Sequence, residues 1–166
     1  MIKEIELIRH TIFDRLGLPI TDLDKDAECE DYSGYNFRLG QLSIKFRKAK
    51  ITPKKTGHFV TLWKRNPHTR ETEPFASTHP FDFFIIAAED KNRQGFFFFS
   101  KDTLVRHKIL TTSLQTGKRG FRVYAAWDIP ESRQAEKTRL WQKKSFISFS
   151  DPDCLEKCRA ILDTKI

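Results

Sequence analysis

The sequence predicts a single α+β domain in which a mixed, mostly antiparallel sheet of five or six strands is flanked by helices. The 166 residues suffice for one domain and are too few for two of ordinary size. Apolar residues recur at helical spacing near both ends of the chain, whereas between them they alternate or form short continuous runs, as in strands. Because no repeat or linker divides the sequence, we expect one domain over residues 1–166.

The first predicted element is an amphipathic helix over residues 2–16, where apolar side chains recur every three or four positions. Gly17 favours a left-handed helix cap and Pro19 lacks an amide proton, so the helix is expected to end there. An acidic stretch over residues 22–31 follows. We expect it to be a solvated loop.

Residues 35–65 are predicted to form a three-stranded antiparallel meander. Apolar positions alternate over 35–39 and 42–46, and the alternation then slips by one residue, to Ala49 and Ile51. A β-bulge near Arg47–Lys48 would absorb the extra residue. Four cations would then share one face of the strand: Lys45, Arg47, Lys48 and Lys50.

Two continuously apolar strands, 81–88 and 96–100, are expected at the centre of the sheet, covered on both faces. A polar hairpin over 89–95 joins them. The remaining predicted elements are a short helix to about residue 110 capped by Ser100 or Asp102, a strand over 121–125, a helix from Pro130 to about 144, and a last helix that begins at Asp151–Pro152.

The positive charge of the chain is concentrated in one segment. The net charge is +8, yet no acidic residue lies between Tyr32 and Arg70, where ten cations fall, and the rest of the chain has a net charge of −2. Phosphate binding favours cations without competing carboxylates, and a two-stranded ribbon fits the DNA major groove. The segment therefore predicts a nucleic-acid interface, with duplex DNA as the expected partner. The alternative is an edge strand whose charges prevent pairing with other chains.

A second cationic cluster, Lys118, Arg119 and Arg122, lies in a turn bounded by Gly117 and Gly120. Such turns can present backbone amides to an anion. We expect this cluster to matter for binding if it folds beside the first segment. Trp63 could stack on unpaired bases, and a core position for it is an equal alternative.

No catalytic or metal-binding residue is predicted. Asp82, Glu89 and Lys91 have the formal spacing of a Mg²⁺-dependent nuclease, but one predicted strand separates Asp82 from the other two by more than ~20 Å. Cys154 and Cys158 are neighbours on the last helix without further ligands nearby in the sequence, so buried core thiols are expected. Motifs for dinucleotides, phosphate loops and serine hydrolases are absent, and no cofactor is expected.

The apolar runs at 83–88 and 96–99 are too short to span a bilayer, and residues 1–10 lack a secretory apolar segment. Three cysteines form no disulfide framework, which is typical of a reducing compartment. We expect a cytoplasmic protein without a membrane partner. The oligomeric state is left open.

Four stretches carry a resemblance: 31–37 (DYSGYNF), 44–65 (IKFRKAKITPKKTGHFVTLWKR), 117–130 (GKRGFRVYAAWDIP) and 134–142 (QAEKTRLWQ). They resemble the MepB family of small bacterial proteins over about residues 30–145. The resemblance implies a restriction-endonuclease-like fold and a cytoplasmic protein that binds nucleic acid. The type member is encoded beside a multidrug efflux pump and its repressor. The basic motif of the family corresponds here to Lys45, Arg47, Lys48, Lys50, Lys54, Lys55, Lys64 and Arg65.

Three functions follow as hypotheses. The first is non-catalytic, largely sequence-independent DNA binding through that basic motif together with Lys118, Arg119 and Arg122. The second is a Mg²⁺-dependent nuclease or a degenerate relative of one, for which this sequence departs from the usual active-site pattern. The third is a protein-interaction module whose basic face docks an acidic partner linked to drug-efflux regulation.

Overall fold

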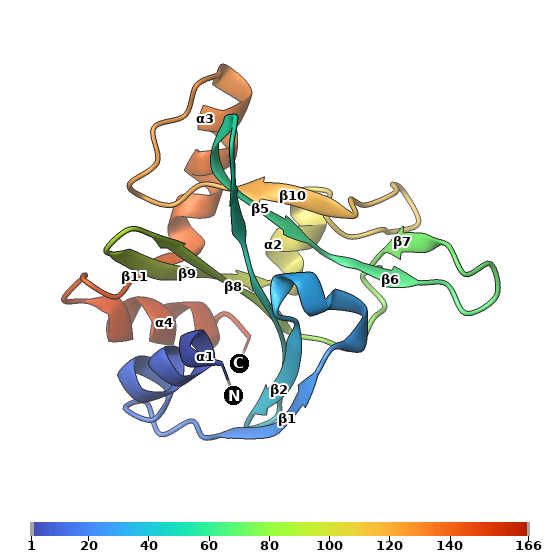
Figure 1. Cartoon of the computed structure of the whole chain (residues 1–166). Helices are drawn as coiled ribbons and strands as arrows, with labels where there is room; N and C mark the ends of the chain where they lie inside the picture. The colour runs from blue at the N-terminus through green and yellow to red at the C-terminus, as the bar shows by residue number, and fades with distance from the viewer. Residues whose placement is uncertain (1, 166) are drawn as a thin grey trace.

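The computed structural model describes residues 2–165 and confirms the α+β class (Figure 1). A six-stranded mixed sheet forms the middle layer. Its strands, in spatial order, are β1 (Ile20–Lys25), β2 (Tyr35–Leu39), β3 (Leu42–Lys48), β8 (Phe83–Asp90), β9 (Arg93–Ser100) and β11 (Phe146–Ser148). β3 and β8 are its parallel pair, and every other neighbouring pair is antiparallel.

β8 and β9 lie at the centre of this sheet, as their continuously apolar sequences predict. Phe83 to Ala88 and Gly95 to Phe99 are all buried. Successive side chains of a strand point to opposite faces, so these strands supply both hydrophobic cores of the molecule. The predicted hairpin over 89–95 is shorter in the structure, because Asp90 pairs with Arg93.

One face of the sheet is covered by the two terminal helices. α1 (Lys3–Ile8) continues into a π-helical turn (Arg9–Phe13), which confirms the predicted N-terminal helix. α4 (Cys154–Asp163) packs on the same core, with Cys154 and Cys158 buried in it as expected. Burial raises the pKa of the Cys158 thiol to about 12, so it is an inert core residue. No helix within residues 2–165 is long and apolar enough to cross a membrane.

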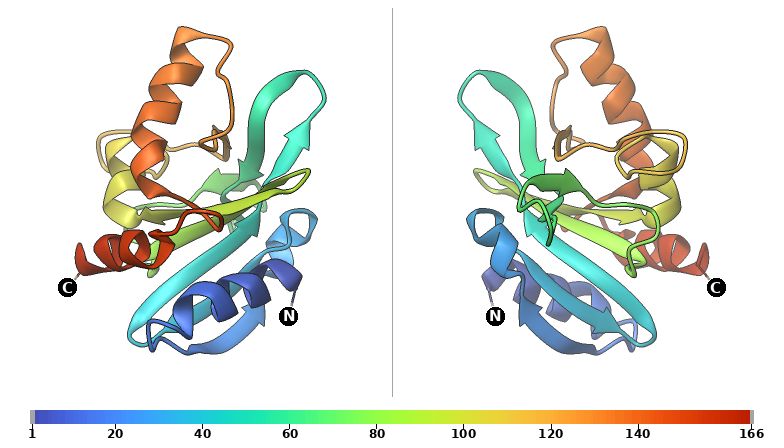
Figure 2. Two further views of the ribbon diagram at one scale, coloured as in Figure 1. Left: turned by 90° about the vertical axis from the view of Figure 1, so that its left-hand side faces the viewer. Right: turned by 90° about the vertical axis from the view of Figure 1, so that its right-hand side faces the viewer.

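The opposite face carries a smaller three-stranded sheet and two helices. In spatial order this second sheet contains β10 (Gly120–Val123), β5 (Lys55–Thr61) and β4 (Lys50–Thr52). α2 (Lys101–Arg106) is capped by Ser100, and α3 (Arg133–Gln142) by Ser132. Figure 2 shows the β4–β5 hairpin projecting from the body of the molecule, on the side where α3 also stands away from the main sheet.

The predicted bulge at Arg47–Lys48 is wrong. β3 pairs regularly with β8 from Ile44↔Phe83 to Lys48↔Ala87, and the amide of Ala49 still donates to the Ala87 carbonyl. The chain leaves the six-stranded sheet only after Ala49 and continues as β4 in the second sheet. A change of sheet, rather than an extra residue in one ladder, therefore explains the slip in the apolar pattern.

The predicted solvated loop over residues 22–31 is also wrong. This segment contains the end of β1 and a 3₁₀ helix (Ala27–Tyr32). β1 pairs with β2, and its acidic side chains are exposed. The prediction failed because it treated these acids as equivalent, whereas Asp26 is turned inward. Residues 63–65, expected as the end of the third strand of the meander, form β6 (Trp63–Arg65) instead, which pairs with β7 (Thr72–Pro74) in a small separate hairpin.

Candidate nucleic-acid interface

The two cations in the middle of β3 are structural. Arg47 is completely buried, and its Nη2 donates to Oδ2 of Asp26 at 2.6 Å. Lys45 lies 3.7 Å from the same oxygen, donates to Asn36 and sits over the Phe75 ring. Burial lowers the pKa of Lys45, and Arg47 lowers it further. Neither cation can reach a phosphate without breaking this buried cluster.

The expected single cationic face is therefore absent. Lys48 follows Arg47 directly and points to the other side of β3, where it pairs with Glu4 of α1 at 2.6 Å and approaches Glu89 at 3.9 Å. Lys50 lies one strand further, in β4, with its ammonium group 4.7 Å from the centre of the Tyr32 ring. The cations predicted to share one face are split between two faces and two sheets.

The cations of β6 are also engaged with protein. Lys64 pairs with Glu73 on β7 at 3.0 Å. Arg65 lies over the Trp63 ring and donates to the Arg70 carbonyl. Trp63 is thus partly covered by a guanidinium group, which leaves it a poorer platform for bases than the sequence suggested.

Seven of the predicted cations form no ion pair with any carboxylate of residues 2–165. Arg65, which lies over the Trp63 ring in the β6–β7 hairpin, is one of the seven, and the other six lie on or beside the second sheet. We call these six the cationic surface: Lys50, Lys54, Lys55, Lys118, Arg119 and Arg122. Lys54 and Lys55 lie at the tip of the β4–β5 hairpin, whereas Lys118 and Arg119 lie in the loop that enters β10. The first and second cationic clusters of the sequence meet here.

Strand pairing brings the two clusters together. β10 pairs with β5 along its whole length, and β5 pairs with β4. Phe59 is opposite Arg122 on one side and Lys50 on the other, so these three side chains lie in one row across the sheet. Arg122 also donates to the Thr52 hydroxyl group of β4. The second cationic cluster therefore lies beside the first, which is the condition under which we expected it to matter for binding.

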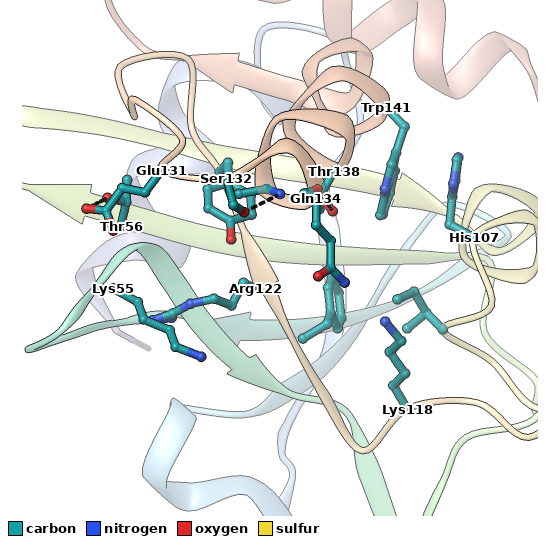
Figure 3. Close-up of a pocket in the computed structure, with 14 residues that line it drawn as sticks. Lys55, Thr56, His107, Lys118, Arg122, Glu131, Ser132, Gln134, Thr138 and Trp141 are labelled. Atoms are coloured by element: carbon teal, nitrogen blue, oxygen red, sulfur yellow. Dashed lines mark hydrogen bonds between the residues drawn. The ribbon is translucent and has the colours of Figure 1, made fainter.

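A pocket of about 520 Å³ lies beside the cationic surface, between the second sheet and α3 (Figure 3). Lys55, Lys118 and Arg122 line it from the sheet side. From the helices it is lined by Gln134 and Trp141 of α3, together with other polar and aromatic side chains. Sequence reasoning missed these residues, because α3 is distant along the chain and mostly polar.

The side chain of Gln142 fixes α3 beside β10. It is completely buried, accepts a hydrogen bond from the amide of Tyr124 at 2.7 Å and donates to the carbonyl of Arg122 at 2.9 Å. β10 is the edge strand of the second sheet, so these bonds replace the partners that a further strand would supply. Gln142 therefore sets the wall of the pocket, although it does not line it.

The nuclease-like residues do not converge. Asp82 immediately precedes β8, accepts the Ser43 amide at 2.8 Å and lies 3.7 Å from Lys165. Glu89 is near the other end of β8, beside Lys3 and Lys48. Lys91 lies beyond that end, in the turn to β9. In the part of the chain that the structure describes, no group of three or more His, Cys, Asp or Glu side chains is placed to hold a metal ion.

This chain matches solved structures of known proteins. It is similar to the crystal structure of MepB, with 29% sequence identity and a TM-score of 0.78 over 91% of this chain and 99% of that one. A bacterial homing endonuclease, I-Ssp6803I, matches at 13% identity and a TM-score of 0.47, covering 95% of this chain and 90% of that one, and this similarity supports no conclusion about activity.

No curated protein matches the sequence. The model of the MepB-like family matches residues 26–148, about three quarters of the chain. That range contains every strand of the second sheet and all six residues of the cationic surface. The chain belongs to the MepB-like family.

Proposed function

We propose that this protein binds nucleic acid, foremost duplex DNA, through the cationic surface and does not cleave it. One observation supports the proposal above all others. Adjacent strands bring together six cations from two separate sequence segments, and these cations have no carboxylate partner within residues 2–165. Cations in that state are free to replace the counterions of a phosphate backbone.

The binding is expected to be largely independent of sequence. Lys and Arg contacts to phosphates position a protein on the duplex without reading base edges. The projecting β4–β5 hairpin is a two-stranded ribbon, which has the width that the major groove accepts. Lys54 and Lys55 at its tip would meet the backbone first.

Binding without cleavage follows from the positions of the acidic residues. Two-metal or one-metal hydrolysis of a phosphodiester needs carboxylates that share a metal ion. Asp82 and Glu89 are instead held at opposite ends of β8 by different partners. A Mg²⁺-dependent nuclease is therefore the less favoured function.

The proposal includes a cytoplasmic location. The three cysteines, Cys29, Cys154 and Cys158, are all free and buried. Free thiols of this kind are typical of a reducing compartment.

Reversing the charge of the hairpin tip tests the proposal. The double variant Lys54→Glu, Lys55→Glu should bind a short DNA duplex more weakly, because two phosphate contacts become repulsive. The slope of log affinity against log salt should flatten by about two units. Fluorescence anisotropy with a labelled duplex, with and without Mg²⁺, measures both quantities and reveals cleavage.

The matched control is Lys143→Glu, Lys144→Glu. These two exposed lysines follow α3, lie outside the pocket lining and make no ion pair within residues 2–165. Both double variants replace two lysines with glutamates, so they change the net charge by the same amount. If both double variants lost affinity equally, net charge rather than the cationic surface would drive binding. Absence of binding at low salt would refute the proposal and favour an acidic protein as the partner.

A further inference from the structure

The pocket between α3 and the second sheet has the size of a small-molecule site rather than of a surface dimple. At about 520 Å³ it lies within the range of ~300–1,000 Å³ that ligand pockets occupy. A row of phosphates crossing the cationic surface would not need such a cavity. Its chemistry therefore calls for a separate explanation.

The sheet side of the pocket favours a phosphate group. Lys55 and Arg122 reach one end of it from β5 and β10, whereas Lys118, in the loop before β10, lies toward the His107 and Trp141 end (Figure 3). Nε and Nη1 of Arg122 are buried and make no hydrogen bond within residues 2–165. Unpaired buried donors are costly, so a bound anion would satisfy groups that the protein leaves unpaired. Glu131 is the one carboxylate in the lining, and it accepts a hydrogen bond from Thr56 at 2.8 Å.

The other end of the pocket favours a planar organic group. His107 and Trp141 are stacked there, with ring centres 3.9 Å apart and planes within 8° of parallel. Burial lowers the pKa of His107, and neighbouring Arg106 lowers it further, so the imidazole is neutral at neutral pH and offers one donor and one acceptor. Gln134 lies between the two ends and adds a side-chain amide, which can hydrogen-bond the edge of a base (Figure 3).

We propose that this pocket binds a nucleoside monophosphate group, with its phosphate at Lys55 and Arg122 and its base toward the His107–Trp141 pair. Such a group could be a free nucleotide or the 5′-phosphorylated terminal nucleotide of a strand. The free-nucleotide form of the site does not depend on the DNA binding proposed above. Both forms share the same chemistry, a phosphomonoester joined to a nucleoside.

Titration calorimetry with adenosine 5′-monophosphate tests the proposal, with adenosine and inorganic phosphate as partial ligands. The nucleotide should bind at least about tenfold more tightly than either part, because both ends of the pocket contribute. Of the three tryptophans, only Trp141 lines the pocket, so its indole N–H signal in an NMR spectrum should shift on titration. Equal affinity for the nucleotide and inorganic phosphate, or no binding of the nucleotide at millimolar concentration, would overturn the proposal.

Matched variants locate the site. Lys55→Ala should weaken nucleotide binding about tenfold, because a charge-assisted hydrogen bond to the phosphate is lost. Lys137→Ala, which removes an equal charge from an exposed position on α3 outside the pocket lining, should leave it unchanged. Gln134→Glu, also at an exposed position of α3, should weaken binding because it places a negative charge in the pocket that also holds the phosphate. Equal effects of the two lysine variants would contradict the proposal.

The source of the nucleotide is distinguished with short single-stranded oligonucleotides that carry either a 5′-phosphate or a 5′-hydroxyl group. If the wild type prefers the 5′-phosphate and Lys55→Ala does not, the site binds the end of a strand. Nucleotide binding without that preference identifies a free nucleotide. If nucleotide binding fails while duplex DNA still binds, only the pocket proposal is refuted and the proposed function stands.

Discussion

Arg47 is the largest side chain that this fold buries completely, and its partner is Asp26. The pair lies between β3 and the 3₁₀ helix that follows Asp26, and Nη1 of Arg47 also donates to the Phe46 carbonyl. Gly34 completes the fit, because a Cβ atom there would lie 2.9 Å from the Cβ of Cys29 and 3.0 Å from Nη1 of Arg47. A residue that looked like a phosphate ligand in the sequence thus holds the acidic segment onto the sheet.

Removing the carboxylate of Asp26 should destabilise the protein. Asp26→Asn leaves the buried guanidinium group without its counter-charge, and breaking a buried ion pair typically costs about 3–5 kcal/mol. Urea denaturation followed by circular dichroism measures the loss. Asp24→Asn, two residues earlier and exposed on β1, is the control and should change stability little. Equal stability of both variants would show that the pair does not support the fold.

Asp26 should also make the stability of the protein depend on pH. Burial alone would raise the pKa of Asp26, but the charges of Arg47 and Lys45 and the hydrogen bond from Arg47 outweigh it, so the pKa is lowered overall. Its stabilising contribution is therefore present above the ordinary aspartate pKa of about 4 and lost as the pH falls through the lower folded value. When the pH is lowered from neutral to strongly acidic, the urea denaturation midpoint should fall more for the wild type than for Asp26→Asn. Parallel pH profiles would contradict this assignment.

At the scale of secondary structure, α3 depends on one buried amide for its position against β10. Gln142→Leu keeps a side chain of similar size but leaves the Tyr124 amide and the Arg122 carbonyl without partners. Each unsatisfied buried group costs about 1–3 kcal/mol. We expect a less stable protein and faster hydrogen exchange at the Tyr124 amide.

The control for this prediction is Gln134→Leu, at an exposed position on the same helix. It should leave exchange at Tyr124 unchanged. Equal acceleration in both variants would indicate that α3 is held by its general packing and not by Gln142.

A strand could be predicted from the sequence where its apolar pattern has one structural cause and is long enough to read. Alternating and continuous apolar runs correctly located β2, β3, β8 and β9, because burial determines those patterns. The passage from β3 to β4 was misread, since a strand that changes sheets and a strand with a bulge produce the same slip in alternation. The three residues of β11 are too few for a period to be read.

The candidate site was predictable only in part, for a physical reason. Charge segregation pointed to the segment that supplies three of the six residues of the cationic surface, but it does not distinguish a cation that meets solvent from one that meets a carboxylate. Asp26 and Arg47 are 21 residues apart in the sequence, and Lys48 is 44 residues from Glu4. Only the tertiary structure shows which cations these acids neutralise.

For the whole molecule, the cations divide into two groups according to whether they pair with a carboxylate. The six cations of the cationic surface make no ion pair within residues 2–165, whereas Lys48, Lys64 and Lys157 pair with carboxylates at 2.6, 3.0 and 3.0 Å. Two triple variants carry the same change of three charges. The first variant removes half of the cationic surface by replacing three lysines with alanine: Lys50, Lys54 and Lys55. The second removes only paired lysines by the same substitution: Lys48, Lys64 and Lys157.

The salt dependence of duplex DNA binding tests this account most directly. If all six residues of the cationic surface neutralise one phosphate each, log affinity should fall against log salt with a slope of about −5. The slope should flatten to about −3 in the first triple variant and stay near the wild-type value in the second. Equal flattening in both variants, or binding by the wild type that does not depend on salt, would contradict the assignment of the cationic surface as the nucleic-acid interface.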